Sequence, residues 1–301
     1  MSSIHKILIA ALLLCTAALG TSHAGLGDYF VDTQWLETNL NRVRVVDVRV
    51  SPLYVLGHVE GAVSVQKGEF LETRRGVKSL VPRAGDFEKL MDRYGITPKT
   101  SVVAYAEDKN PYAARFVWTL RFHGHDKAFV LDGGYDKWVK ESRPRSFFPV
   151  VVASTEGYRC TAGSDIRAEA DYVLSRIGNP ATTIWDARRR AEYDGSEIRA
   201  DRGGHIPGVT HLDWTELQKD SDGVMVLKSE SELRTLLAAR GIRPDSEIVA
   251  HCQTGIRSAY ATVVLLGLGY ERVKNYDGSW IEWANEPFFP IEPRLEVSVW
   301  Q

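Results

Sequence analysis

The chain has 301 residues, of which 44% are hydrophobic and 25% are charged, and its formal net charge is -2. This is the composition of a globular protein long enough for two domains of ordinary size. The near balance of charge excludes the strongly basic surface that attracts nucleic acids or anionic membranes, so we expect neither as a partner.

The first 24 residues differ in character from the rest of the chain. Lys6 precedes an apolar run over residues 7–20, and residues 22–24 form a small-x-small cleavage signal before Gly25. This pattern predicts a signal peptide over residues 1–24, and the apolar run is too short for a membrane span. We therefore expect a periplasmic or secreted protein without a stable membrane anchor.

Four sequence blocks occur twice in the same order, separated by roughly 140 residues, the length of one domain. Such a period predicts a duplicated domain rather than a solenoid. The paired blocks are Asp47 and Arg49 with Asp186 and Arg188, 57–62 with 204–209, 101–105 with 247–251, and 132–138 with 277–283.

Each copy alternates strand and helix patterns. Short apolar runs at 43–48, 102–106, 182–186 and 248–252 predict buried parallel strands. Residues 259, 262, 263 and 266 share one face of a helix that ends at two glycines. The fold class is therefore α/β, with a parallel sheet flanked by helices in each of two domains. The predicted boundaries are 1–24 for the signal peptide, 25–145 for the first domain, 146–164 for a linker without periodicity, and 165–301 for the second domain.

Together, the Asp-x-Arg block, the Gly-His turn, a cysteine loop after a strand and the Asp-Gly-Gly/Ser ending with its tryptophan resemble the rhodanese family. Their order is similar to that of tandem-domain thiosulfate and 3-mercaptopyruvate sulfurtransferases, and the resemblance covers nearly all of the chain after the signal peptide. It implies two tandem rhodanese-like domains with the active site at the cleft between them.

The loop from Cys252 to Ser258 joins a predicted strand to a predicted helix. Its small and polar residues can direct successive N–H groups at one point, and the positive helix end adds to this field. A thiol held there becomes a thiolate, the nucleophilic form. We predict Cys252 as the catalytic nucleophile that carries sulfur as a persulfide. The predicted substrate-binding residues are Gln253, Thr254, Gly255, Ile256, Arg257, Ser258 and Arg188.

The first copy has Ala106 at the position of Cys252, followed by Glu107 and Asp108. Without a thiol, and with two carboxylates in place of an anion site, this copy is predicted to be inert. In the tandem arrangement it would form one wall of the cleft and shape access of the donor.

These residues and the resemblance predict transfer of sulfane sulfur from thiosulfate to cyanide or a thiol, with no metal or organic cofactor. A 3-mercaptopyruvate sulfurtransferase and a persulfide carrier for a protein partner are the alternatives. Cysteine phosphatases of this fold place five residues between cysteine and arginine, whereas four separate Cys252 from Arg257. The shorter loop favours a sulfur atom over a phosphoryl group with three equatorial oxygens.

Thiosulfate-specific relatives have an arginine where this chain has Glu192. Arg257 can supply that missing charge or pair with Glu192, and the sequence leaves both open. For Asp186 and Arg188 we favour a mutual ion pair over contact with substrate, because the inert copy has the same pair.

The remaining histidines, tryptophans and cysteine are expected to be structural. His58 and His205 occur in both copies and should stabilise turns, while strand alternation points His251 away from Cys252. His123 and His125 have no third metal ligand nearby. Trp138, Trp280 and Trp283 are core candidates, with Trp280 a candidate for the cleft wall. Cys160 is either a spectator or a disulfide partner of Cys252.

Overall fold

The computed structural model describes residues 25–161 and 165–292. The predicted signal peptide at 1–24 lies outside the described residues, as do residues 162–164 of the predicted linker. Within the described part of the chain, no helix is long and apolar enough to cross a membrane.

The first sheet has five parallel strands in the order β1-β8-β7-β2-β4. Helices surround it because its strands are apolar on both faces. The elements of this part of the chain are η1 Leu26–Asp28, β1 Phe30–Val31, α1 Thr33–Asn39, η2 Leu40–Arg42, β2 Val43–Asp47, α2 Ser51–Val55, β3 His58–Val59, β4 Val63–Ser64, α3 Lys67–Phe70, β5 Glu72–Arg74, β6 Val77–Leu80, α4 Ala84–Arg93, β7 Ser101–Tyr105, α5 Tyr112–Phe122, β8 Ala128–Leu131, α6 Gly134–Lys140 and β9 Arg145–Ser146.

The second sheet repeats this topology, in the order β10-β16-β15-β11-β12, again with every neighbour parallel. The predicted duplication and the α/β class are therefore confirmed. The elements are β10 Arg167–Ala168, α7 Ala170–Arg176, β11 Thr182–Asp186, α8 Arg190–Tyr193, β12 Thr210–His211, η3 Trp214–Leu217, β13 Gln218–Ser221, β14 Val224–Leu227, α9 Glu230–Ala239, β15 Glu247–His251, α10 Ile256–Gly267, β16 Val273–Tyr276 and α11 Ser279–Trp283.

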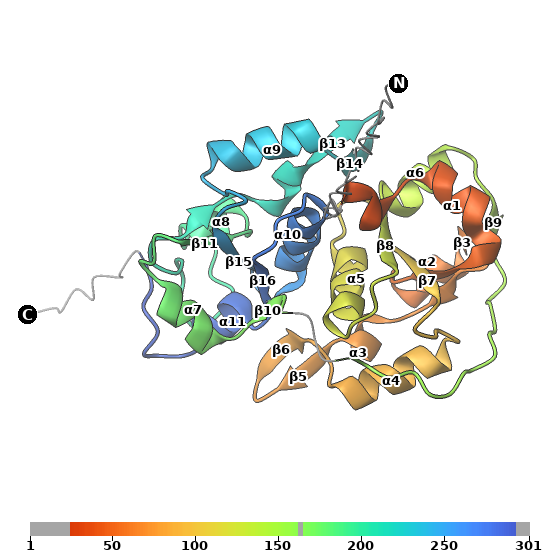
Figure 1. Ribbon diagram of the computed structural model, residues 1–301, viewed down its shortest axis with the longest axis horizontal. Coiled ribbons are helices and arrows are strands. Elements are labelled where there is room, and N and C mark those ends of the chain that lie inside the picture. The colour runs from red at the N-terminus through yellow and green to blue at the C-terminus, as the bar shows by residue number, and fades with distance from the viewer. Residues whose placement is uncertain (1–24, 162–164, 293–301) are drawn as a thin grey trace, which may run out of the picture.

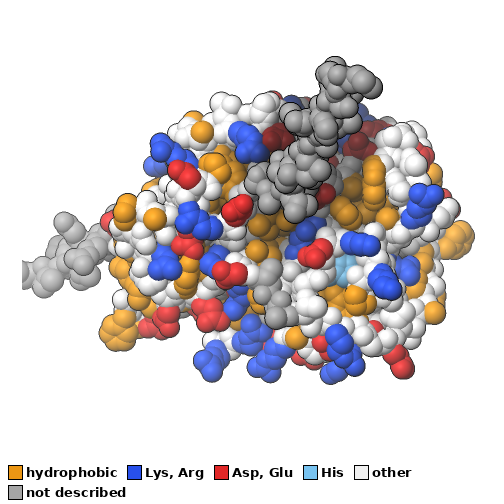
Figure 2. Space-filling view, viewed as in Figure 1, with side chains coloured by type: hydrophobic (Ala, Val, Ile, Leu, Met, Phe, Trp, Pro, Cys, Tyr) orange, Lys and Arg blue, Asp and Glu red, His pale blue; other side chains and the backbone are white. Residues whose placement is uncertain are grey.

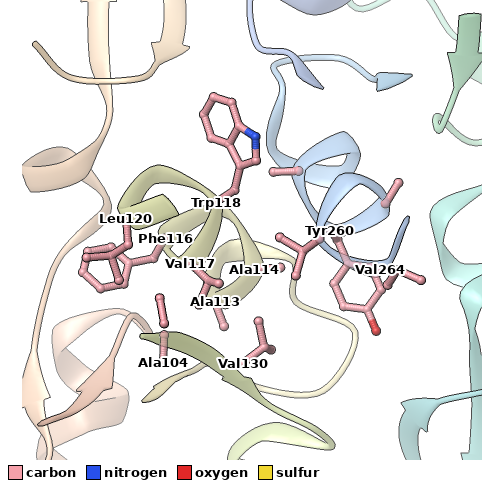
Figure 3. Packing of buried hydrophobic residues seen from close by; sticks show 14 of the residues in the cluster. Ala104, Ala113, Ala114, Phe116, Val117, Trp118, Leu120, Val130, Tyr260 and Val264 are labelled. Atoms are coloured by element: carbon pink, nitrogen blue, oxygen red, sulfur yellow. The ribbon is translucent and has the colours of Figure 1, made fainter. Parts of the chain in front are cut away.

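The two halves lie side by side and meet along α5 and α10 (Figure 1). Buried residues of both halves form one continuous hydrophobic cluster through this contact. In Figure 3, α5 packs over the strand residues Ala104 and Val130 and faces Tyr260 and Val264 of α10. An interface built from core residues holds the two sheets in a fixed relation, which matters for a site between them.

Each half also covers the other with a two-stranded antiparallel hairpin. The hairpin β5–β6 of the first half reaches the second, where the Val81 N–H donates to Asp277 Oδ2 at 2.8 Å. The hairpin β13–β14 of the second half reaches back, and the Leu227 N–H donates to Asp132 Oδ1 at 2.7 Å. Asp132 and Asp277 are equivalent positions of the repeat, so the exchange is reciprocal.

The segment that follows the first half is not a free tether. The strand β9 pairs with β3, which ties Ser146 to the first half. Farther on, the Thr155 N–H donates to the Asp92 carbonyl, and Tyr158 is buried with its ring at an edge-to-face angle to Phe87. The absence of periodicity in this stretch reflects irregular backbone that packs through single anchoring side chains.

Candidate active site

Cys252 follows the last residue of β15 and precedes α10, at the carboxyl edge of the second sheet. Its side chain is 1% exposed. The Cys252 N–H donates to Ser279 Oγ at 3.1 Å, and the Cys252 carbonyl accepts from the Trp280 N–H at 2.9 Å. The start of α11 therefore holds the backbone of the cysteine on both sides. Ser279 adopts a φ of +52°, where the inert copy has Gly134 at +55°, so a strained serine provides one of these contacts.

The turn into α10 depends on Gly255, which has a φ of +74°. A Cβ atom at this position would lie 2.5 Å from both the Cα and the carbonyl oxygen of Asp277. The Gly255 carbonyl accepts from Asn275 Nδ2 at 3.0 Å and from Arg115 Nη1 at 3.1 Å. Close packing on Asp277 therefore excludes every other residue, and two donors fix the peptide plane of the turn.

The surroundings of Cys252 favour the thiolate. Burial alone would raise the pKa of Cys252, but Arg257 and hydrogen bonds from the Ser258 hydroxyl and the N–H groups of Ser258 and Thr254 outweigh it, so the pKa is lowered. The Ser258 hydroxyl lies 3.5 Å from Cys252 Sγ. The predicted anion cradle of loop N–H groups at a helix start is thus present around the sulfur.

Arg257 forms a bidentate ion pair with Glu192, with distances of 2.6 and 2.8 Å. Glu192 is 1% exposed and also accepts from Arg189 at 3.1 Å and Arg199 at 3.2 Å. Although burial opposes ionisation, these arginines lower the pKa of Glu192 to about 2. Of the two roles that the sequence left open, the structure shows the pairing, while Arg257 still lowers the pKa of Cys252.

Arg188 is buried and engaged by the protein itself. Its Nη2 lies 2.6 Å from Asp186 Oδ2 and 2.8 Å from the Gly204 carbonyl. The first copy repeats the arrangement, with Arg49 at 2.6 Å from Asp47 and at 2.7 Å from the Gly57 carbonyl. The favoured interpretation as a mutual ion pair is confirmed, whereas substrate binding by Arg188 stays a prediction.

The other predicted loop residues lie together around the cysteine. Gln253 is 6% exposed and donates from Nε2 to the Arg199 carbonyl at 2.9 Å. Ile256 is buried and Thr254 is half-buried. Ser258 is fully buried, and its hydroxyl lies 2.6 Å from Asn275 Oδ1.

Two residues of the first half reach the site that sequence reasoning did not single out. Tyr112 and Arg115, both on α5, interact with the charge of Cys252. Burial and this charge raise the pKa of Tyr112, whereas burial lowers the pKa of Arg115 to about 10 against the opposing effects of Asp277 and Cys252. Arg115 is fully buried. The sequence signal that could have identified Arg115 is a charged residue within a mostly apolar stretch of helix, because arginine is rarely buried without partners.

The position of Ala106 is equivalent to that of Cys252 in three dimensions as well as in sequence. Ala106 follows β7 directly, is 2% exposed, and lies in a loop whose Asp108 accepts from the Met225 N–H of the hairpin β13–β14 at 3.0 Å. In the first half, the loop that corresponds to the cysteine loop therefore carries Asp108, a carboxylate that bonds the opposite hairpin.

The histidines are structural. His58 and His205 bond the carbonyls of Tyr54 and Tyr193 and stack on those rings, so they stabilise turns as predicted. His251 is buried 3.7 Å from Asp186, and burial lowers its pKa to about 4.

The tryptophans that the sequence suggested as core residues are part of the core. Trp138, Trp280 and Trp283 are all buried, and Trp280 packs against Arg188. The described residues contain no group of three or more potential metal ligands. Cys160 and Cys252 are both free thiols.

A cavity of about 1070 Å³ lies between the hairpin β5–β6 and the helices α7 and α11. One lining residue, Ile281, donates its N–H to the Gln253 carbonyl at 3.0 Å, so the cavity adjoins the cysteine loop. The hairpin carries Arg74, Arg75 and Lys78. Figure 2 shows Lys and Arg side chains gathered along the lower edge of the molecule in this region.

Comparison with known proteins matches both halves to one family model, described as the rhodanese-like domain, over residues 32–141 and 169–286. The chain belongs to the rhodanese family. Among its curated rhodanese relatives is the thiosulfate sulfurtransferase of Pseudomonas aeruginosa, 33% identical over 249 residues that make up 82% of this chain and 90% of that protein. Another is the sulfur carrier protein TtuD of Thermus thermophilus, 34% identical over 88% of this chain and 96% of that protein.

The tandem rhodanese fold also occurs in solved structures. One is the anaerobic ergothioneine biosynthesis enzyme from Chlorobium limicola in complex with trimethyl histidine. It is 21% identical, with a TM-score of 0.77 over 88% of this chain and 70% of that chain. This likeness bears on the fold alone.

Proposed function

We propose that this protein is a thiosulfate sulfurtransferase that carries sulfur as a persulfide on Cys252. The observation that carries the proposal is a buried thiol in the loop between β15 and α10, whose pKa is lowered despite burial by Arg257 and hydrogen bonds, at a position where the other copy has Ala106. The curated relatives named thiosulfate sulfurtransferase, at 33% and 35% identity over 82% of the chain, support the same reaction class.

The reaction proceeds in two displacement steps. The Cys252 thiolate attacks the outer sulfur of thiosulfate, a new S–S bond forms, and the S–S bond of the donor breaks so that sulfite leaves with the electron pair. Cyanide or a thiolate then attacks the terminal sulfur of the persulfide and releases the Cys252 thiolate. This is covalent catalysis with ping-pong kinetics.

The chain supplies electrostatic support for both steps. The N–H groups of Thr254 and Ser258 and the Arg257 guanidinium that lower the pKa of Cys252 would equally stabilise a terminal persulfide anion. The predicted binding residues Gln253, Gly255 and Ile256 would shape the same pocket.

A persulfide carrier that serves a protein acceptor is the second candidate. The relative named sulfur carrier protein TtuD favours it, at 34% identity over 88% of the chain. The two functions share the persulfide and differ in the acceptor. A 3-mercaptopyruvate donor remains the alternative for the first step, and a phosphatase is disfavoured because four residues, not five, separate Cys252 from Arg257.

We further propose that the protein is exported and that its leader is cleaved after Ala24, leaving a first domain to 145, a connecting segment over 146–164 and a second domain from 165. The apolar run and the small-residue signal at 22–24 support export. The amino-terminal sequence of the mature protein, recovered from the periplasm or the medium, tests this proposal. A mature chain that retains residues 1–24 in the cytoplasm would refute it.

The decisive experiment for the activity is intact-mass measurement after incubation with thiosulfate. The wild type should gain one sulfur atom, Cys252→Ser should gain none, and Cys160→Ser should behave as the wild type. Release of sulfite and turnover with cyanide or small thiols then favour the enzyme, whereas a stable persulfide that only a protein thiol discharges favours the carrier. A wild-type protein that takes no sulfur from thiosulfate or 3-mercaptopyruvate would refute both.

A further inference from the structure

Arg115 is a residue of the half without a cysteine, yet its functional group lies in the other half. It is the fourth residue of α5, the helix that packs against α10, and it is fully buried. Figure 3 shows its neighbours Ala114 and Trp118 at this contact. Burying a guanidinium is expensive unless partners replace its water. The partners of Arg115 therefore indicate what this charge is for.

Those partners join the catalytic loop to the hairpin that covers it. Arg115 Nη1 donates to the Gly255 carbonyl at 3.1 Å, and Nη2 donates to the Ser79 carbonyl at 2.8 Å. Nη2 also lies 3.7 Å from Asp277 Oδ2, the carboxylate that accepts from the Val81 N–H. One planar fork thus ties Gly255 in the second half to Ser79, near the end of β6, and through Asp277 to the residue that follows β6.

The contact with Gly255 controls the geometry of the anion cradle. Gly255 is the left-handed residue at which the loop turns, and the N–H groups that reach Cys252 lie on either side of it, at Thr254 and Ser258. The Gly255 carbonyl shares its peptide plane with the Ile256 N–H, so a rotation of that plane would displace the loop between Thr254 and Ser258. Asn275 holds the same carbonyl at 3.0 Å, but from within the second half.

Arg115 also carries a buried charge that interacts with the Cys252 thiolate. Burial lowers its pKa to about 10, against the opposing effects of Asp277 and Cys252, so the guanidinium remains protonated at neutral pH. The charged and titratable groups that interact with Cys252 are Arg257 on α10 and Tyr112 and Arg115 on α5, and Asp277 lies 3.7 Å from Arg115.

We propose that Arg115 is a positioning residue for sulfur transfer: by holding the Gly255 carbonyl and adding a buried positive charge to the site, it makes the cysteine-less domain an integral part of the active site. This inference rests on the proposed function for its kinetic consequence. Its effect on the thiol can be measured without any sulfur donor.

The experiment compares Arg115→Gln and Arg115→Lys with the matched control Arg121→Gln. Arg121 lies on the same helix, and its guanidinium donates to the carbonyls of Asp28 and Ala128 in the first half. The first readout is the ultraviolet titration of the Cys252 thiolate. The second is the single-turnover rate of persulfide formation from thiosulfate, with kcat and KM measured separately.

For Arg115→Gln we expect the thiolate titration to move to higher pH, because a cation that favours the thiolate is lost. We expect persulfide formation to slow by about 10- to 100-fold, the usual effect of a misplaced reacting group. Arg115→Lys should restore the titration, because it keeps the charge, but should recover only part of the rate, because an ammonium cannot replace the planar fork. Arg121→Gln should match the wild type in both readouts.

A wild-type titration and rate in Arg115→Gln would overturn the proposal. So would equal slowing in Arg115→Gln and Arg121→Gln with no change in titration, which would mark a role in stability alone. If Arg115→Gln does not fold, Arg115→Lys decides, and a wild-type rate in that variant refutes the positioning role. Should the wild type accept no sulfur at all, the sulfurtransferase proposal fails while the shift in titration still tests the link between Arg115 and the thiol.

Discussion

Replacing Glu192 with glutamine tests how the buried carboxylate that pairs with Arg257 affects the stability of the fold and the pKa of Cys252. Glu192 is 1% exposed and accepts hydrogen bonds from Arg257, Arg189 and Arg199. The glutamine is nearly the same size but carries no charge, so the variant removes the ion pairs and leaves the packing.

The magnitude follows from the pKa of Glu192, which falls from 4.5 to about 2 on folding. At about 1.4 kcal/mol per pKa unit this corresponds to about 3 kcal/mol. Solvent screens the half-exposed Arg189 and Arg199, which reduces the expected loss of unfolding free energy to about 1–2 kcal/mol. A depressed carboxylate pKa stabilises the fold above the unfolded value, so this contribution should disappear as the pH falls from about 4.5 to about 2.

The assay is urea unfolding followed by tryptophan fluorescence, at neutral pH and at acid pH. Glu192→Gln should unfold at lower urea at neutral pH and approach the wild type toward pH 2. The control Glu230→Gln removes an exposed pair with Arg234 and should change the free energy by less than about 0.5 kcal/mol. Equal stability of Glu192→Gln and wild type at neutral pH, or a difference that persists undiminished in acid, would refute the reasoning.

The same variant should change the pKa of the Cys252 thiol in the opposite direction to Arg115→Gln. Without the carboxylate, the charge of Arg257 acts on Cys252 uncompensated, so the thiolate titration should move to lower pH. The KM for thiosulfate should fall, because Arg257 becomes available to an anionic donor. An unchanged titration in a folded Glu192→Gln protein would show that Glu192 does not attenuate Arg257.

Three further outcomes are expected. Gly255→Ala should lose sulfur transfer at least about 10-fold, because the new Cβ would lie 2.5 Å from Asp277 atoms at a φ of +74°; a wild-type rate would contradict the tight turn. Ala106→Cys should not create a second persulfide site detectable by intact mass, because its loop bonds the opposite hairpin and presents carboxylates; a second sulfur atom on this variant would contradict that account. In a pH titration of thiolate absorbance, Cys252 should ionise below pH 9.0 and Cys160 near pH 11, because burial and Glu88 raise the pKa of Cys160. The variants Cys252→Ser and Cys160→Ser assign the two transitions, and the reverse order would contradict this account of the electrostatics.

The predictions from sequence that the structure confirms are those with a local cause. The repeat and its α/β class follow from strand and helix patterns within each copy. The pairing of Asp186 with Arg188 follows from the same two residue types at the same spacing in the inert copy. The thiolate cradle at Cys252, expected from a strand, a short polar loop and a helix in immediate succession, stays a prediction that the lowered pKa of Cys252 supports.

The role of Arg257 needed more than local sequence. Its partner Glu192 lies 65 residues earlier in the chain, whereas the other two arginines that share Glu192 are local, Arg189 at i,i+3 and Arg199 seven residues on. Local spacing can indicate the pairs with Arg189 and Arg199, but nothing in the sequence fixes the contact between Glu192 and Arg257. The connecting segment was likewise expected as a linker because it lacks periodicity, and only its packing shows that it is anchored to the first half.

What the sequence determined by itself was the reactive group: one cysteine in a loop suited to hold a thiolate, and an alanine in its place in the other copy. What only the tertiary structure decided was how the two copies share one site. A hairpin of each half contacts the other half, and Arg115 of the first half donates a hydrogen bond to the Gly255 carbonyl of the second at 3.1 Å. The physical reason is that patterns along the chain report burial and local hydrogen bonding, whereas contacts between residues 140 positions apart depend on how two finished domains pack.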